Sequence, residues 1–219
     1  MAVNPFKKFK RKMIRKLFKS NNKRRKSNNL LDFNPSLNKN DIIIDCGANV
    51  GNVIKPIINI GCQIIAFEPN PHAFNVLNQN FIDNKNVKCY QKAVSTKDGM
   101  SELFLHENSK KDNLYWSTGS SLQSTKNNID KENFVIVKTI NFSNFVLSLN
   151  KEIKIVKIDI EGEEVKVINQ LLDKNLHLKI AQIIVETHEK KIPLLNAQLN
   201  KLKERIRKMK IDNISFNWL

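Results

Sequence analysis

The sequence has little of what stabilises a secreted or membrane-spanning protein. Only three cysteines occur among the 219 residues, and their odd number and lack of C-x-x-C spacing argue against a disulfide framework or a zinc ribbon. The longest apolar stretch, residues 53–67, is interrupted by lysine, proline, asparagine and glutamine, whereas a membrane-spanning helix needs about 18 apolar residues in succession. We therefore expect a reducing, cytoplasmic location, with peripheral association at a membrane surface as the alternative.

The composition is typical of a globular protein. Hydrophobic residues make up 41% of the chain and charged residues 26%, which argues against a disordered chain, a collagen or a coiled coil. A chain of this length buries roughly 70 to 75% of its unfolded surface and needs no metal or disulfide to hold a core. We expect one domain with an appendage: a leader over residues 1–29 and a body over residues 30–219.

Most of the net charge lies in the leader. The chain has 37 basic and 21 acidic residues, a formal charge of +16, and twelve of the basic residues fall within residues 7–26. Apolar residues recur at helical spacing from Phe6 to Phe18, and the cations occupy the opposite face. A basic amphipathic helix within residues 5–26 suits an anionic membrane surface. Three alternatives stay open: docking on the body, an electrostatic arm for nucleic acid, and a cleaved transit peptide.

The body alternates between two hydrophobic periods. Short apolar runs that predict buried strands are found at residues 41–45, 63–67, 87–94, 154–160 and 181–185. Helical spacing is found between them, at residues 53–60, 71–81 and 163–172. This alternation predicts an α/β fold, in which a mostly parallel sheet has helices on both faces and right-handed crossovers connect the strands.

Two regions depart from this rhythm. Residues 100–145 contain two expected strands, 102–105 and 134–140, around a polar loop, and we expect this insertion beside the sheet to form a wall for a substrate. The C-terminal part predicts a basic helix over residues 194–209 and a last strand over residues 214–219.

A glycine-containing turn, DCGANVG, follows the first expected strand over Asp45 to Gly51. Ligands of open α/β sheets bind at the carboxyl ends of the strands, so this turn is a candidate binding loop. Gly47 lets the backbone turn sharply against a ligand, and Gly51 lets the following helix approach the strand. The spacing matches neither the dinucleotide motif G-x-G-x-x-G nor the phosphate loop, which disfavours hydride transfer and phosphoryl transfer.

A second motif, AFEPNP, ends the second expected strand, about 20 residues beyond the first loop. An acidic residue in this position, here Glu68, is placed to accept hydrogen bonds from both hydroxyls of a ribose. The alternative is an ordinary solvated loop acid. The position of Glu68 after the Asp45 to Gly51 turn favours ribose binding.

A third motif, KIDIEGEE, ends the strand over residues 154–160. Strand alternation places Lys157, Asp159 and Glu161 on one side, where three charges need a pairing partner or a ligand. The alternative is a structural ion pair between Lys157 and Asp159 ahead of a helix N-terminus. The next strand ends in Glu186 and His188, which are expected at the same rim. Together these residues predict a general-base site or an oxygen-rich metal site, with an ordinary loop histidine as the alternative for His188.

In this order, the motifs DCGANVG, AFEPNP and KIDIEGEE, together with KAVSTKDG and VETH, resemble the FkbM family of S-adenosylmethionine-dependent methyltransferases. The resemblance covers roughly residues 41–188 and implies a Rossmann-like class I methyltransferase fold that O-methylates a hydroxyl, often on a sugar. Residues implied for the methyl donor are Asp45, Gly47, Ala48, Asn49 and Gly51 for its methionine part, Glu68 for its ribose and Ala93, at the end of the third strand, for its adenine. Residues implied for catalysis are Asp159, below the sulfonium, and Glu161, Glu186 and His188.

Several points stay open from sequence alone. The expected acceptor is a small molecule or a glycan, and the alternatives are an RNA methyltransferase that binds phosphates through the basic segments and a non-catalytic nucleoside-binding module. Asp159 or His188 is the expected base, and a divalent metal stays open as a second requirement. Sheets of this type usually end in an antiparallel pair of strands, whereas here one strand from Ile214 is expected. The oligomeric state is open.

Overall fold

The computed structural model describes residues 29–218 of the chain. The amphipathic helix expected within residues 5–26 lies outside the described residues, so the division into leader and body stays a prediction. None of the helices in the described part is long and apolar enough to cross a membrane.

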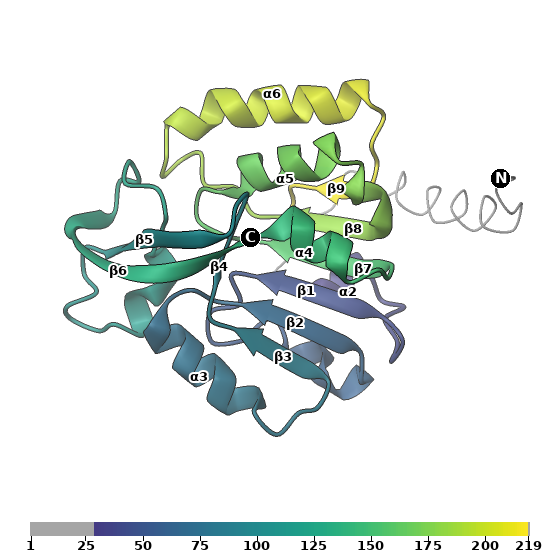
Figure 1. The fold of residues 1–219 in the computed structure, drawn as a ribbon, viewed down its shortest axis with the longest axis horizontal. Coiled ribbons are helices and arrows are strands. Elements are labelled where there is room, and N and C mark those ends of the chain that lie inside the picture. The colour runs from purple at the N-terminus through teal and green to yellow at the C-terminus, as the bar shows by residue number, and fades with distance from the viewer. Residues whose placement is uncertain (1–28, 219) are drawn as a thin grey trace, which may run out of the picture.

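A six-stranded parallel sheet forms the centre of the body (Figure 1). Its strand order is β3-β2-β1-β7-β8-β9, and neighbouring strands pair in parallel throughout. The bounds are β1 Ile42–Cys46, β2 Gln63–Phe67, β3 Val87–Tyr90, β7 Ile153–Ile158, β8 Ile180–Val185 and β9 Ile214–Ser215. The predicted α/β class with a mostly parallel sheet is therefore confirmed.

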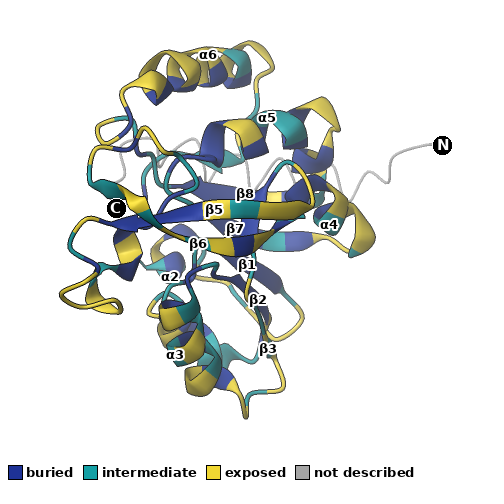
Figure 2. Ribbon diagram, turned by 60° about the vertical axis from the view of Figure 1, so that its left-hand side comes forward, coloured by how far each residue is buried: buried dark blue, intermediate teal, exposed yellow. Residues whose placement is uncertain are grey.

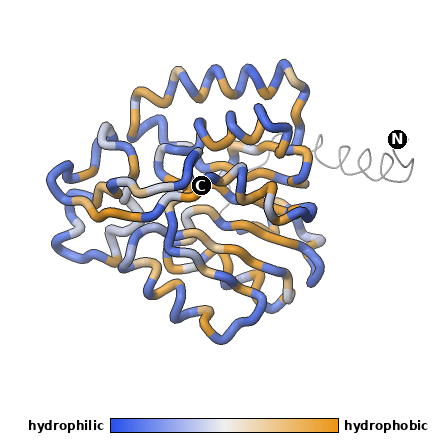
Figure 3. Tube along the Cα trace, in the orientation of Figure 1, coloured by the Kyte–Doolittle hydropathy of each residue, from blue (hydrophilic) through white to orange (hydrophobic). Residues whose placement is uncertain are grey.

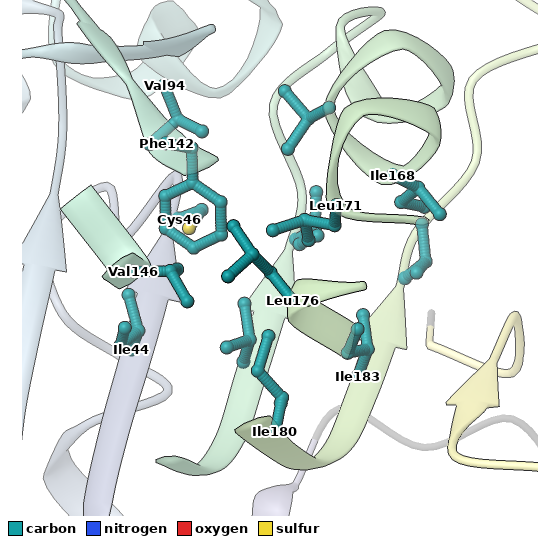
Figure 4. Close-up of a cluster of buried hydrophobic side chains, with 14 of the residues drawn as sticks. Ile44, Cys46, Val94, Phe142, Val146, Ile168, Leu171, Leu176, Ile180 and Ile183 are labelled. Atoms are coloured by element: carbon teal, nitrogen blue, oxygen red, sulfur yellow. The ribbon is translucent and has the colours of Figure 1, made fainter. Parts of the chain in front are cut away.

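Both faces of the sheet are covered, as near-continuous apolar strands require. Every residue of β1 is buried, and neighbours such as Ile43 and Ile44 belong to different apolar clusters because successive side chains point to opposite faces. One face packs against α4 (Phe142–Ser148), α5 (Glu164–Asp173), the 3-10 helix η3 (Leu176–Lys179) and α6 (Leu194–Lys208) (Figures 1 and 4). The other packs against α2 (Leu30–Phe33), the 3-10 helix η1 (Lys55–Ile60) and α3 (Pro71–Phe81).

Helix α6, the outermost helix, has an apolar side that is buried and a polar side that is exposed. Four apolar residues of α6 are buried against the body, namely Leu195, Leu199, Leu202 and Ile206. Four of its basic residues lie exposed on the outer face, which is hydrophilic in Figure 3, namely Lys201, Lys203, Arg207 and Lys208, whereas Arg205 turns to α5 and bonds to Asn169 and Asp173 (Figures 2 and 3). The predicted basic helix over residues 194–209 is thus present and uses its apolar stripe for packing.

Helix α3 begins and ends where the spacing predicted. The Asn70 side chain accepts hydrogen bonds from the backbone N–H groups of His72 and Ala73, and Pro71 occupies the first helical position. This N-cap fixes the start of α3 directly after the second motif.

The insertion forms a second, three-stranded sheet of order β4-β6-β5. Its elements are β4 (Ala93–Ser95), β5 (Gly99–His106), the 3-10 helix η2 (Tyr115–Gly119) and β6 (Ile129–Asn141). The prediction of one strand over residues 87–94 is wrong, because β3 ends at Tyr90 and β4 starts in the other sheet. The Lys92 N–H donates to the Tyr90 carbonyl at 2.9 Å, a tight turn at two polar residues that carries the chain between the sheets.

The C-terminal strand is shorter than predicted. β9 covers only Ile214–Ser215 of the expected residues 214–219, and it pairs with β8 in parallel. Beyond it, the Trp218 side chain is buried in the apolar cluster below the sheet, with its ring centroid 5.7 Å from that of Phe33. The last residues of the chain therefore anchor the edge of the sheet through an aromatic contact.

Candidate active site

A cavity lies where the three sequence motifs meet, at the carboxyl ends of β1, β2 and β7. Gly47, Glu68 and Asp159 all line it, one from each motif. Strands β2 and β7 flank β1 on opposite sides, so the chain leaves β1 at the point where the strand order reverses. Open α/β sheets bind ligands at this switch point. The predicted convergence of the three motifs is therefore present in the structure.

The first loop is tied to both other motifs through its backbone. The N–H groups of Gly47 and Ala48 both donate to the Phe67 carbonyl at 2.9 Å. Gly47 has a φ of +81°, and a Cβ there would lie 1.8 Å from the Asp159 carbonyl oxygen. Only glycine fits this position, because the loop backbone passes directly against the end of β7.

Glu68 is the buried carboxylate of the cavity. It is 5% exposed, and its two carboxylate oxygens accept hydrogen bonds from the N–H groups of Asn49 and Asn70, each at 2.8 Å. Burial raises the pKa of Glu68 to about 7, although these two hydrogen bonds oppose the shift. Each oxygen keeps a further lone pair, so the side chain can accept hydrogen bonds from two neighbouring hydroxyls.

Lys157 lies beneath the first loop. Its ammonium Nζ is 3.3 Å from Asp45 Oδ1, 3.1 Å from Asp159 Oδ2 and 3.0 Å from the Gly47 carbonyl oxygen. Burial alone would lower the pKa of Lys157, but Asp159 and Asp45 outweigh it and the net shift is upward. The predicted Lys157–Asp159 ion pair exists, with Asp45 as a further partner.

Not every residue implied for the donor reaches the cavity. Asp45 is fully buried and acts on the loop through Lys157, and burial raises its pKa. Ala48 packs in the apolar cluster below the sheet. A Cβ on Gly51 would lie 2.3 Å from the Phe81 ring, so this glycine allows α3 to approach rather than lining the cavity. Ala93 does line the cavity, from the start of β4 instead of the end of β3.

The acidic residues of the third motif lie beyond the strand and not along it. β7 ends at Ile158, and Asp159 and Glu161 follow in a tight loop where Glu161 has a φ of +52°. The expected strand alternation through Glu161 is therefore wrong. The Asp159 N–H still donates to the Cys46 carbonyl at 3.0 Å, which keeps this loop beside the first one. Both carboxylates line the cavity.

His188 lies in the loop that follows β8, but it is buried and contacts four carboxylates, unlike the ordinary loop histidine of the alternative interpretation. Its Nδ1 is 2.8 Å from Glu164 Oε1, and its Nε2 is 3.3 Å from Glu161 Oε2 and 3.6 Å from Asp159 Oδ1. Glu186 Oε1 is 3.8 Å from the same Nε2. Burial lowers the pKa of His188, but the hydrogen bond and charge of Glu164 and the nearby carboxylates raise it to about 9. The predicted convergence of these side chains is present.

The sequence did not predict the contacts of two residues in this cluster, Glu164 and Lys126. Glu164 was expected only as an acidic residue at a helix N-terminus, yet its side chain also accepts the Gly162 N–H at 3.0 Å and orients His188. Lys126 lies in the polar part of the insertion, where no motif marks it. Its side chain is fully buried, and its Nζ donates to the Gly119 carbonyl and lies 2.9 Å from Glu161 Oε2.

The insertion closes over the cavity through a segment that we call the strap, residues 115–126. Asn49 donates to Ser117 Oγ at 2.8 Å, and Asn70 donates to Ser120 Oγ at 3.0 Å. Ser121 Oγ donates to the Glu161 carbonyl at 2.5 Å. The strap thus contacts each of the three motif loops, and the expected wall beside the sheet is present.

A parallel α/β sheet with its cavity at the switch point, a buried acid after β2 and a second acid after β7 defines a Rossmann-like protein that binds a small ligand. The family model described as the methyltransferase FkbM domain matches residues 45–209. The chain therefore belongs to the FkbM methyltransferase family. No curated protein matches the chain.

Solved structures of other methyltransferases resemble the fold at low sequence identity. Methyltransferase FkbM from Methylobacillus flagellatus KT has 12% identity and a TM-score of 0.48, over 77% of this chain and 38% of that one. The human methyltransferase 10 domain containing protein has 10% identity and a TM-score of 0.40, over 95% and 71%. The N-terminal domain of human METTL16, solved with SAH, has 12% identity and a TM-score of 0.37, over 96% and 63%. The chain thus spans well under half of the first of these structures.

Proposed function

We propose that the protein is an S-adenosylmethionine-dependent methyltransferase that O-methylates a hydroxyl of a sugar or glycan-type acceptor. Family membership supports the class of enzyme. The single observation that carries the proposal is that Gly47, Glu68 and Asp159 line one cavity, because each comes from a different motif loop.

The residues present suit the methyl donor. Glu68 offers a buried carboxylate to the two ribose hydroxyls. Gly47 lines the same cavity and lets the first loop lie directly against the Asp159 backbone, where a side chain would collide. Asp159 and Glu161 place negative charge at the cavity wall, which favours a sulfonium electrostatically. The bound donor supplies an activated methyl group, whose bond to sulfur breaks as its bond to the acceptor oxygen forms.

The chain must also receive the hydroxyl proton, since an alcohol is a weak nucleophile until that proton leaves. Besides Glu68, which is assigned to the ribose, Asp159 and Glu161 are the acidic residues that line the cavity. His188 lies behind them and, with a pKa of about 9, carries a proton at neutral pH. We therefore assign proton uptake to the Asp159–Glu161 side of the cavity and prefer Asp159 to His188 as the direct contact. Glu186 and His188 support these carboxylates.

Calorimetry with S-adenosylhomocysteine tests the donor site. The wild-type protein is expected to bind it, and Glu68→Ala is expected to weaken binding at least about tenfold, because two charge-assisted hydrogen bonds are lost. Glu102→Gln is the matched control, since Glu102 is exposed on β5 away from the cavity. No binding by the wild type, or binding unaffected by Glu68→Ala, contradicts the proposal.

An acceptor screen separates the remaining alternatives. Transfer of a labelled methyl group from the donor to monosaccharides and oligosaccharides is expected, and RNA is offered in parallel. Transfer to RNA with a steep dependence on salt would replace the glycan by a nucleic acid acceptor. Binding of S-adenosylhomocysteine without methyl transfer to any acceptor would instead favour a non-catalytic nucleoside-binding module.

A further inference from the structure

The acidic cluster beside the cavity has the arrangement of a cation site. Asp159, Glu161 and His188 each offer one ligand atom, and these atoms all lie within 4.8 Å of one another. The His188 Nε2 is 3.3 Å from Glu161 Oε2 and 3.6 Å from Asp159 Oδ1. Ligands at right angles around a cation with bonds of about 2.1 Å lie about 3 Å apart, and His188 Nε2 is already close to this separation from both carboxylates.

The imidazole of His188 is held in the orientation that a metal ligand needs. Its side chain is 2% exposed, and its Nε2 has no hydrogen-bond partner although it points at the carboxylates. On the other side of the ring, Nδ1 contacts Glu164 Oε1 at 2.8 Å. A histidine that ligates a metal commonly donates its second N–H to a carboxylate in this way, which fixes the ring and aims the other nitrogen at the remaining ligands.

Glu164 in turn is fixed by the backbone. Its carboxylate oxygens accept the Gly162 N–H at 3.1 and 3.0 Å, and Oε1 accepts the Ile160 N–H at 3.2 Å. These bonds come from the loop that carries Asp159 and Glu161. The ligand loop and the residue that orients His188 are therefore one rigid unit.

The neighbouring lysines leave negative charge uncompensated. Lys126 and Lys191 both pair with Glu161, and Lys157 divides its charge between Asp45 and Asp159. Glu186 faces the same imidazole nitrogen, with its Oε1 3.8 Å away. A carboxylate oxygen has two lone pairs, so Glu161 Oε2 can bind a cation while it also accepts from Lys126.

We propose that this cluster binds a divalent cation of the Mn²⁺ type through His188 Nε2, Asp159 and Glu161, with Glu186 as an additional ligand. An imidazole together with carboxylates favours a first-row transition metal over Mg²⁺, which prefers oxygen ligands alone. Asp159 and Glu161 also line the cavity, so the cation lies at its wall. In a role that rests on the proposed function, the cation would coordinate the acceptor hydroxyl and lower its pKa, which eases proton loss.

Electron paramagnetic resonance of the full chain with Mn²⁺ tests the site. Titration of metal-free protein is expected to show a single tight site, and the spin-echo modulation of bound Mn²⁺ is expected to contain the coupling of an imidazole nitrogen. His188→Gln is expected to abolish this coupling and to weaken binding at least about tenfold. His72→Gln is the matched control, because His72 is exposed on α3. It is expected to change neither signal.

Two results overturn the site. One is Mn²⁺ bound by the wild type without nitrogen coupling, or not bound at all. The other is nitrogen coupling that persists in His188→Gln. Should His188→Gln fail to fold, Asp159→Asn replaces it, and unchanged affinity in a folded Asp159→Asn protein counts against the site. Calorimetry with S-adenosylhomocysteine is done on the same sample without metal, so loss of Mn²⁺ binding and loss of donor binding are separate outcomes.

Discussion

At the scale of single residues, the protonation of Glu68 links the donor site to pH. Burial holds its pKa at about 7, above the ordinary value of 4.5, so a proton occupies it in the empty protein below neutral pH. Two ribose hydroxyls need the ionised form, and the proton must then leave before the ligand binds. Affinity for S-adenosylhomocysteine is therefore expected to fall about tenfold for each pH unit below about 7 and to level off above it.

Calorimetry between pH 5.5 and 8.5, chosen as roughly 1.5 units on each side of this pKa, measures the dependence. Glu68→Gln cannot titrate at this position, so its weaker binding is expected to vary little over the same range. Wild-type affinity that is flat, or that rises as the pH falls, would show that the carboxylate does not contact the ligand in its ionised form.

Two glycines with nearly the same φ are expected to differ sharply in their tolerance of alanine. Gly47 and Gly61 have φ values of +81° and +78°, and a Cβ on Gly61 meets nothing nearer than 3.7 Å. Gly61→Ala is expected to lower the free energy of unfolding by about 1 to 2 kcal/mol, because alanine disfavours the left-handed conformation. Gly47→Ala adds a collision with the Asp159 carbonyl, so we expect about 2 to 5 kcal/mol in total. Chemical denaturation measures both, and equal losses would contradict the tight approach of the first loop to β7.

At the scale of elements, the sequence carries most of the fold. β2 and α3 cover the predicted residues 63–67 and 71–81, because apolar spacing, the Asn70 cap and Pro71 all act locally. The three motif loops follow three buried strands, and parallel pairing alone brings the ends of such strands to one rim. The convergence of Glu68 and Asp159 at one rim could therefore be predicted from the sequence, and the structure shows it. Their roles in donor binding and catalysis stay predictions.

Long-range contacts without a local signal could not be predicted. The strand break after Tyr90 depends on a second sheet, whose partner β6 lies more than thirty residues further along the chain. Lys126 resembles any surface lysine in a polar loop, and its burial against Glu161 follows from how the insertion folds back. The burial of Trp218 depends on Phe33, near the start of the body, which is far away along the chain.

The strap is expected to be held closed by its serine contacts. Ser117 and Ser120 accept the side-chain amides of Asn49 and Asn70, and each such bond contributes about 1 kcal/mol. The double variant Ser117→Ala with Ser120→Ala is expected to raise amide hydrogen exchange in the strap about tenfold or more. Mass spectrometry measures it, with Ser124→Ala, an exposed serine of the same segment, as the control. Exchange that does not change, or that Ser124→Ala raises equally, contradicts this account.

At the scale of the whole molecule, charge is divided unevenly along the chain. Twelve of the 37 basic residues lie within residues 7–26, so the rest of the chain has 25 basic against 21 acidic residues, a charge of +4. The body by itself therefore has little excess charge for a large anionic partner, and we propose that the leader provides the attraction to an anionic membrane surface.

Vesicle flotation tests this proposal at the level of the full chain. Each basic residue near an anionic surface contributes about 1 kcal/mol, so the protein is expected to float with vesicles that contain phosphatidylserine and not with neutral ones. Glutamine in place of the Lys23–Lys26 cluster removes four of the twelve leader charges and is expected to weaken flotation strongly.

The same replacement of four exposed α6 cations is the control, namely Lys201, Lys203, Arg207 and Lys208. Because both variants lose the same total charge, equal weakening would show that net charge, and not the leader, drives the association. Binding that persists at high salt would instead indicate an apolar contact, since screening removes surface electrostatics first.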